Sequence, residues 1–338
     1  MLYFITLAVL VLIYLRLDEL KLIGSIFAVS NYGWLALIIV IQVFVYYFQA
    51  LNYRDVLRIK DLEVNPGELY PMSFVVQFLN QALPSAGLSG QVFFIQYLKR
   101  YGLSVAEGIG RAFIEVMTVW MAMGSFFIAS SVIVLQGGAI ANVPELRFVI
   151  YFFSFLTVIA VSVFFLIQRR KRGKLARWIT EWLHSRFEKK NHANHAEMVF
   201  DQLKNSINFR LLQKKAKHFW MAYFWQCMII IGHILTLYFI SLAIGQPIGF
   251  RLALIVFSLV RFIGMVAFVP GALGVFEASM TLILISFGVA SGAALAMTLL
   301  LRAFTFWLPM PVGWALYRWY YMQYKLQSLS EKWRGPNS

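Results

Sequence analysis

The sequence predicts an all-α polytopic membrane protein. Hydrophobic residues make up 60% of the 338 residues and charged residues only 13%, whereas soluble domains carry about 25% charged residues. The mean hydropathy is +0.71. Apolar runs that approach or exceed the roughly 17 to 25 residues needed to cross a bilayer recur from end to end. We therefore expect residues 1–338 to form a single membrane domain.

The topology follows from the basic residues. Residues 169–217 hold 14 Lys and Arg but 4 Asp and Glu, and a basic cluster directly after a span is typical of a cytoplasmic loop. That assignment makes the C-terminus cytoplasmic as well. Residues 2–15 lack the basic start of a signal peptide, so we interpret them as a short first span. The sequence then predicts about six full spans, at residues 2–15, 34–51, 112–135, 149–167, 219–242 and 294–317.

Two further apolar segments are interrupted by Pro, Gly and polar residues. In residues 69–98 the interruption from Asn80 to Gln91 reads NQALPSAGLSGQ, and in residues 252–289 the interruption from Pro270 to Glu277 reads PGALGVFE. The first segment has arms too short to span, which predicts a re-entrant hairpin from the cytoplasmic side. The second is either a re-entrant hairpin from the outer side, completing an inverted repeat, or two crossings that bring the total to eight spans.

The residues of the interruptions have two interpretations. Backbone amides freed from helical pairing need protein, water or a ligand as partners. The polar side chains could pair with this backbone or bind a ligand: Asn80, Gln81, Ser85, Ser89 and Gln91. The turns themselves are expected at Pro84, Gly87, Gly90, Pro270, Gly271 and Gly274.

Five charged residues fall in or beside apolar segments, where a mid-membrane charge costs about 2.5 to 3.5 kcal/mol: Arg111, Glu115, Arg261, Glu277 and Arg302. Arg111 and Glu115 are four residues apart, so they are expected on one helix face, either as a structural pair or lining a cavity. Three Arg against two Glu leaves one positive charge in excess. A phosphate headgroup would balance it, and the forked guanidinium suits phosphate oxygens.

The basic loop at residues 169–217 contains an apolar helical face next to basic residues, at 178–187. This pattern predicts interfacial amphipathic helices in contact with anionic lipid. No nucleic-acid recognition module occurs in the loop, so we expect no nucleic-acid partner. His192 and His195 are not joined by further ligands, and nucleotide or catalytic motifs are not found. We therefore expect no metal, no cofactor and no enzymatic activity.

The chain resembles the flippase-like family that includes the transmembrane region of lysylphosphatidylglycerol synthase. The resemblance rests on residues 78–91 (FLNQALPSAGLSGQ), 97–102 (YLKRYG) and 269–277 (VPGALGVFE). It implies movement of an aminoacylated phospholipid between leaflets of a prokaryotic cell membrane. We expect the synthase domain to be absent, since the chain stops shortly after the last span. Ala272 stands where the family commonly has glycine.

Together these features predict a translocator that binds an anionic or aminoacylated phospholipid, or a polyprenyl phosphate, in an intramembrane cavity. Two alternatives stay open. The protein could be a membrane-embedded enzyme, or an accessory subunit, acting on lipid-linked sugars or amino acids. It could instead be a scaffold that recruits a partner through the basic loop. The sequence also leaves open whether the chain forms a homo-oligomer.

Overall fold

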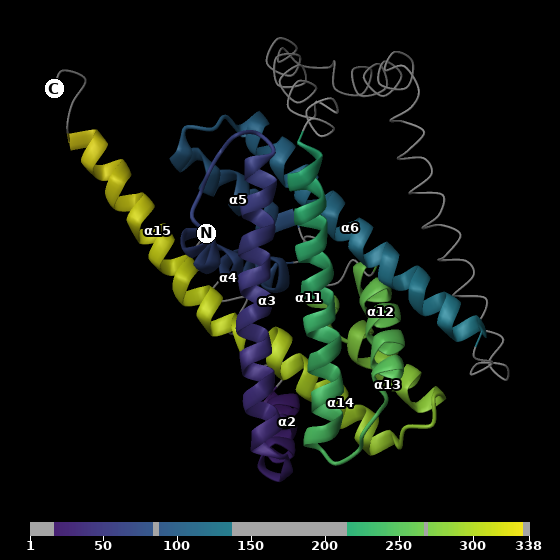
Figure 1. Cartoon of the computed structure of the whole chain (residues 1–338). Coiled ribbons are helices and arrows are strands. Elements are labelled where there is room, and N and C mark those ends of the chain that lie inside the picture. The colour runs from purple at the N-terminus through teal and green to yellow at the C-terminus, as the bar shows by residue number, and fades with distance from the viewer. Residues whose placement is uncertain (1–16, 84–87, 137–214, 267–269, 334–338) are drawn as a thin grey trace, which may run out of the picture.

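Four of the predicted spans are present. The computed structural model describes residues 17–83, 88–136, 215–266 and 270–333, and all regular structure within these ranges is helical. In them, four helical stretches are long and apolar enough to cross a membrane: α3 (Tyr32–Arg58), α6 (Val105–Gln136), α11 (Ala216–Ala243) and Ser291–Gln323 (Figure 1). The predicted spans 2–15 and 149–167 and most of the basic loop 169–217 lie outside the described residues.

The last of these stretches is not a uniform α-helix. It comprises α14 (Ser291–Arg302), the π-helical segment η3 (Ala303–Trp307) and the beginning of α15 (Pro309–Trp333). The π-helical segment is closed by a bond from the Leu308 amide to the Ala303 carbonyl. Short π-helical insertions of this kind are frequent at functional sites.

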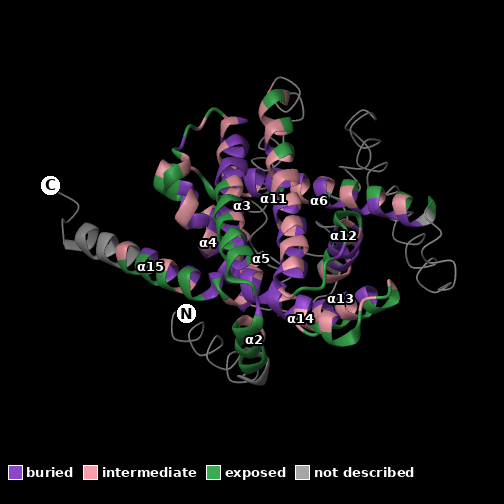
Figure 2. Cartoon of the chain, turned by 60° about the horizontal axis from the view of Figure 1, so that its bottom comes forward, coloured by how far each residue is buried: buried purple, intermediate pink, exposed green. Residues whose placement is uncertain are grey.

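Helix α2 (Leu17–Val29) is an element that the sequence analysis did not assign. Most of its described side chains are exposed (Figure 2). Ile23 is buried against Leu299 and Ala303 in a small apolar cluster, and the half-buried Ile26 and Phe27 pack against the same cluster. The helix is therefore anchored to the last span.

Both interrupted segments form helix pairs with short arms. The first pair is α4 (Pro66–Ala82) and α5 (Leu88–Leu98), followed by the 3-10 turn η1 (Lys99–Tyr101). The second is α12 (Phe250–Val266) and α13 (Val275–Ser286), with the turn η2 (Pro270–Ala272) between them. At 1.5 Å per residue the arms measure about 26, 17, 26 and 18 Å, below the ~30 Å of a hydrocarbon core.

The two pairs occupy opposite ends of the bundle. Figure 1 shows α5 near the upper end and α12, α13 and α14 in the lower half. Helix α4 nevertheless contacts the turn η2, so the interruptions meet inside the bundle. The re-entrant interpretation of residues 252–289 and the alternative of two full crossings both stay predictions.

Helices α3 and α11 pack closely against each other, and a few polar side chains form hydrogen bonds between their otherwise apolar faces. Gln42 donates its Nε2–H to Thr236 Oγ1 at 2.8 Å, and Asn52 donates its Nδ2–H to the Ala222 carbonyl at 2.8 Å. A Cβ at Gly232 would lie 2.5 Å from Val45 Cγ2, so the glycine permits the close approach. Small residues and interhelical hydrogen bonds are the expected means of packing helices in lipid.

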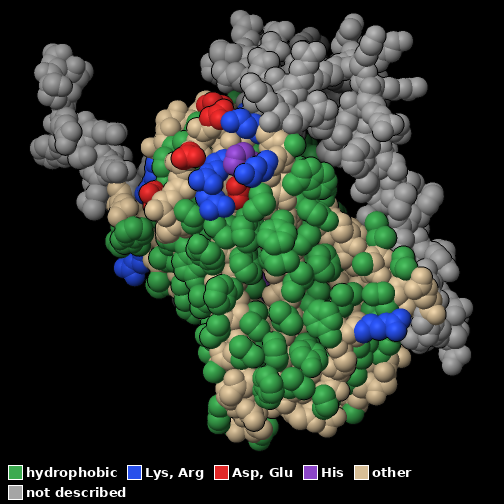
Figure 3. Space-filling view, viewed as in Figure 1, with side chains coloured by type: hydrophobic (Ala, Val, Ile, Leu, Met, Phe, Trp, Pro, Cys, Tyr) green, Lys and Arg blue, Asp and Glu red, His purple; other side chains and the backbone are tan. Residues whose placement is uncertain are grey.

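The apolar interior is divided between the two ends. One buried cluster joins α6 and α11 to the second helix pair and α14, and another joins α3 to the first helix pair and α15. Charged side chains gather at the upper end, where α3 ends and α11 begins (Figure 3). There Asp55 accepts hydrogen bonds from Trp225 Nε1 at 2.9 Å and Arg54 at 2.9 Å, and it contacts His218.

Candidate functional site

A polar cavity of about 320 Å³ lies deep within the bundle. Its walls include residues from both interruptions and from both apolar clusters. Along α3, Gln49 is nine residues from Arg58, and along α11, His233 is ten residues from Ala243. At 1.5 Å per residue both side chains lie about 14 to 15 Å from a helix end, at the depth of the hydrocarbon core.

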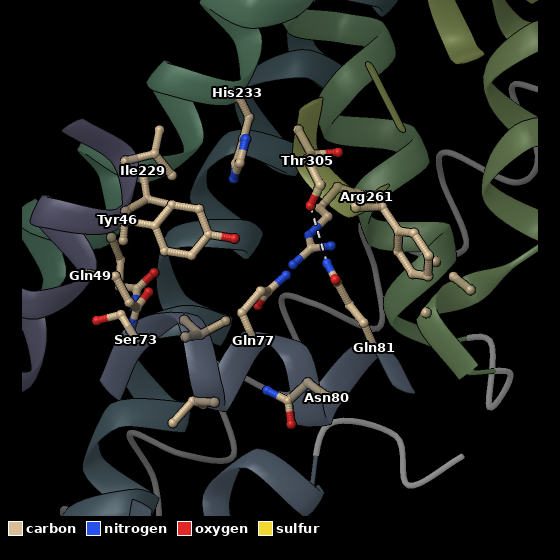
Figure 4. Close-up of a pocket in the computed structure, with 18 of the residues that line it drawn as sticks. Tyr46, Gln49, Ser73, Gln77, Asn80, Gln81, Ile229, His233, Arg261 and Thr305 are labelled. Atoms are coloured by element: carbon tan, nitrogen blue, oxygen red, sulfur yellow. Dashed lines mark hydrogen bonds between the residues drawn. The ribbon is translucent and has the colours of Figure 1, made fainter. Parts of the chain in front are cut away.

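Amide side chains dominate the polar lining of this cavity (Figure 4). They are Gln49, Gln77, Asn80, Gln81, Gln91 and Gln226. Other polar residues join them: Glu115, His233, Arg261, Arg302 and the phenols Tyr46 and Tyr53. Within the described ranges no three His, Cys, Asp or Glu side chains are placed to hold a metal ion. The lining therefore suits a polar organic group that both donates and accepts hydrogen bonds.

In the first interruption, two polar residues bond to the backbone of their own hairpin. Asn80 Oδ1 accepts the Gly90 amide at 2.8 Å, and Ser89 donates to the Leu79 carbonyl at 2.7 Å. Gly90 is required for this contact, because a Cβ there would lie 2.5 Å from both Asn80 Oδ1 and the Val76 carbonyl. Ser85, Pro84 and Gly87 lie outside the described residues.

Gln81 connects the first interruption to the last span. Its Nε2–H donates to the Thr305 carbonyl at 3.1 Å. In a continuous α-helix that carbonyl would accept from the residue four positions later, which is Pro309 and has no amide hydrogen. The glutamine thus satisfies a carbonyl that proline leaves free, beside the π-helical segment.

Glu115 is held by amides. Its Oε1 accepts from Gln49 Nε2 at 3.3 Å and its Oε2 accepts from Gln91 Nε2 at 2.7 Å. Arg111 does not pair with it: the guanidinium donates to the Glu107 carbonyl at 3.2 Å, and Arg111 is not among the cavity residues. The i, i+4 spacing thus did not produce the expected pair, and the structure separates Arg111 from the other candidate side chains.

In the second interruption, Glu277 and Arg302 form a buried ion pair. The Arg302 Nε to Glu277 Oε1 distance is 2.5 Å, and both side chains are at most 12% exposed. The other Glu277 oxygen accepts the Gly274 amide at 2.6 Å, which caps α13, and Arg302 also donates to the Gly271 carbonyl at 2.8 Å. The pair therefore fastens the turn after Pro270 to the last span.

Two aromatic rings complete the surroundings of Arg302. Its guanidinium carbon lies 4.8 Å from the Phe276 ring centroid and 4.5 Å from that of Phe306. The cation is thus enclosed by a carboxylate, a carbonyl and two ring faces, an arrangement that stabilises a buried charge. Gly271 is also needed here, because a Cβ at that residue would lie 2.4 Å from the Phe306 ring.

Arg261 contrasts with Arg302. Protein surrounds it, yet its side chain remains accessible because it borders the cavity. Figure 4 shows it extending into the cavity on the side where Gln77 and Gln81 lie. In the part of the chain that the structure describes, it forms no hydrogen bond or ion pair that would neutralise its charge. The cavity therefore contains a cation that has no carboxylate partner among the described residues.

Several lining residues were not singled out from the sequence. Gln49, Gln77 and Gln226 are amides within apolar helices, a signal that could have identified them. Tyr46 also lines the cavity, and its ring stacks on Phe74 with centroids 3.8 Å apart. His233 also borders the cavity and stacks on Phe257.

A family model described as the lysylphosphatidylglycerol synthase transmembrane region matches residues 2–313. The chain belongs to this family. It is an integral, multi-pass membrane protein. It is 25% identical over 291 residues to a UPF0104 membrane protein of Methanothermobacter thermautotrophicus, covering 83% of this chain and 82% of the relative. A UPF0104 membrane protein of Methanocaldococcus jannaschii is 20% identical over 311 residues, covering 90% and 89%.

Within this lysylphosphatidylglycerol synthase transmembrane family, Ala272 is the residue that departs from the glycine expected after Pro-Gly. Its φ is +53°, in the left-handed region that glycine adopts without cost. A Cβ at Gly264 would lie 3.3 Å from the Ala272 methyl, which shows how closely the turn packs against α12. The turn thus has the conformation that glycine favours, although alanine occupies the position.

Proposed function

We propose that this protein moves a phosphate-bearing lipid between the two leaflets, with the headgroup passing through the central cavity and the acyl chains staying in the bilayer. The observation that carries the proposal is Arg261, a cation in a polar intramembrane cavity with no carboxylate partner among the described residues. An unpaired charge at this depth is costly, and it is retained where a ligand supplies the counter-charge.

The chemistry of the cavity favours a phosphate as that ligand. A guanidinium offers forked donors that match two phosphate oxygens. Gln77 and Gln81 lie on the same side of the cavity as Arg261, and amides can donate to further oxygens. Arg302 is already occupied by Glu277 and Gly271, so we assign the phosphate contact to Arg261.

The size of the cavity supports a translocator that handles headgroups. A volume of about 320 Å³ lies at the lower limit of small-molecule sites, so it suits a headgroup without its acyl chains. The family membership supports a lipid substrate. We also propose that the end bearing Arg58 and Lys215 faces the cytoplasm, since basic residues collect there.

Leaflet exchange in proteoliposomes tests the proposal. The protein is reconstituted with a trace of fluorescent phosphatidylglycerol, and the fraction of label that dithionite reduces over time is measured. We expect the protein to accelerate exchange of this lipid and not of a fluorescent glucosyl diacylglycerol, which lacks phosphate. Arg261→Gln should weaken transport about 10- to 100-fold, the effect of losing one charge-assisted contact of ~1.5 to 3 kcal/mol.

Arg251→Gln is the matched control, because Arg251 is also on α12 but donates to the Ile133 carbonyl outside the cavity. It should leave exchange unchanged. Equal rates for Arg261→Gln and wild type would contradict the phosphate assignment. Absence of exchange with every phospholipid and polyprenyl phosphate would refute the translocator, and chemical turnover of a lipid-linked sugar would favour the membrane-embedded enzyme.

A further inference from the structure

Glu115 is a buried carboxyl group with neutral partners. It is 4% exposed and borders the cavity, and its two oxygens accept hydrogen bonds from Gln49 and Gln91. Among the described residues no Lys, Arg or His lies within ion-pair distance of it. A carboxylate in this position has only amide dipoles to stabilise its charge, unlike Glu277, which has Arg302.

The titratable groups on neighbouring helices do not supply the missing charge. On α3, Tyr46 and Tyr53 border the cavity with phenol groups, which supply no positive charge. Arg111, one turn earlier on α6, donates to the Glu107 carbonyl instead. Arg261 on α12 and His233 on α11 border the same cavity without forming an ion pair with Glu115. The α4 and α5 residues of the cavity wall contribute only amides, a serine hydroxyl and apolar side chains.

The amides around Glu115 can serve both protonation states of the carboxyl. An ionised carboxylate only accepts, whereas a protonated one must also donate. Gln91 Oε1 is buried and accepts no hydrogen bond from the described residues, so a Glu115 O–H has an acceptor on the side chain that already contacts it. Rotation of the Gln91 amide presents its oxygen instead of its nitrogen to Glu115, whereas a lysine or arginine side chain has only donors to offer.

Charge balance connects this carboxyl to the proposed transport. In the empty cavity, Arg261 and ionised Glu115 sum to zero, as do Arg302 and Glu277. A bound phosphodiester brings the sum to minus one. We propose that Glu115 then takes up one proton, so that the loaded cavity is again neutral, and that the proton crosses with the lipid and leaves to water on the other side. This inference rests on the proposed function.

Infrared spectroscopy tests the protonation independently of transport. Delipidated protein in dodecyl maltoside, a detergent without phosphate, is titrated with and without phosphatidylglycerol, and the carboxylic-acid C=O stretch is followed. We expect a band that is absent from Glu115→Gln and that persists to higher pH when phosphatidylglycerol is present. The band should survive in Glu107→Gln, a carboxyl on the same helix that caps Ser104 outside the cavity. The inference is wrong if phosphatidylglycerol does not change the pH to which the band persists, or if no band from Glu115 appears at any pH.

A pH gradient across proteoliposomes tests the coupling. One unit of pH is a tenfold proton gradient, which a one-proton step can convert into up to about tenfold asymmetry of the labelled lipid between leaflets. Glu115→Gln resembles the protonated side chain, so it should exchange lipid without building asymmetry. Equal asymmetry in wild type and Glu115→Gln would exclude Glu115 as the coupling group. Transport that does not respond to the pH gradient would refute the coupling but not the proposal that the protein is a translocator.

Discussion

Removing the Glu277 carboxylate should destabilise the protein strongly. In Glu277→Ala, Arg302 stays buried at 7% side-chain exposure and loses its carboxylate partner, while the Gly274 amide loses its cap. Breaking one side of a buried pair costs about 3 to 5 kcal/mol. The Gly271 carbonyl and the two aromatic rings still stabilise Arg302, so we expect a loss near the lower limit, about 3 kcal/mol.

Glu277→Gln separates the two roles of this side chain. Glutamine at the third helical position can still cap the Gly274 amide, but it carries no charge for Arg302, so we expect a smaller loss of about 2 kcal/mol. The double variant Glu277→Gln with Arg302→Gln should recover part of this loss, because no charge remains buried and unpaired.

Unfolding in mixed micelles, followed by tryptophan fluorescence, measures these free energies. Glu63→Ala is the matched control: Glu63 contacts Arg58 at 3.7 Å but its side chain is 80% exposed, so the pair should contribute less than about 0.5 kcal/mol. The reasoning fails if Glu277→Ala and Glu63→Ala change the free energy of unfolding equally, or if the double variant costs the sum of the single ones.

Three further predictions concern the interruptions and the charged end. Gly90→Ala places a methyl 2.5 Å from the Val76 carbonyl, so it should lower the free energy of unfolding by more than about 2 kcal/mol, whereas Gly292→Ala, where space is open and φ is not positive, should not lower it. Ala272→Gly should raise it by about 0.5 kcal/mol, since relief of a positive φ outweighs the added chain entropy; a loss would contradict this. Burial lowers the pKa of Lys60 to about 8, and the nearby positive charge of Arg111 adds to this shift. The free energy of unfolding should therefore rise between pH 8 and about 10.5, by about 1 kcal/mol after allowance for solvent screening. Lys60→Gln should abolish that rise.

The sequence contained enough to predict the four spans that the structure describes and the two interruptions, because hydrophobic length and broken periodicity act locally. It also placed Glu277 and Arg302 among the candidates, and these two side chains form an ion pair in the structure. It could not predict which candidates meet. The Arg111 and Glu115 spacing fixes only their place on one helix face, whereas the side-chain rotamers are decided by the Glu107 carbonyl and by glutamines from α3 and α5.

The π-helical segment was predictable in part. Pro309 within an apolar span signals that the carbonyl four residues earlier, at Thr305, lacks its helical partner. That Gln81 would supply the partner depends on the packing of α4 against α15, which joins residues more than two hundred positions apart. Loop chemistry and composition carry no information at that separation, so the cavity itself could be located only from the fold.

The two arginines at the cavity differ in their bonding partners, and this difference distinguishes a structural charge from a charge that a ligand could bind. Arg302 has a carboxylate, a carbonyl and two aromatic faces, so a ligand would have to displace contacts that already satisfy it. Arg261 is also a guanidinium, but it has none of those partners among the described residues. A phosphate that binds it would displace no carboxylate there. Arg302→Lys should therefore impair folding more than binding, because lysine cannot make the forked and stacked contacts. Arg261→Lys should fold normally and bind phosphate less well. If both variants fold equally well and transport equally poorly, the division between the two arginines is wrong.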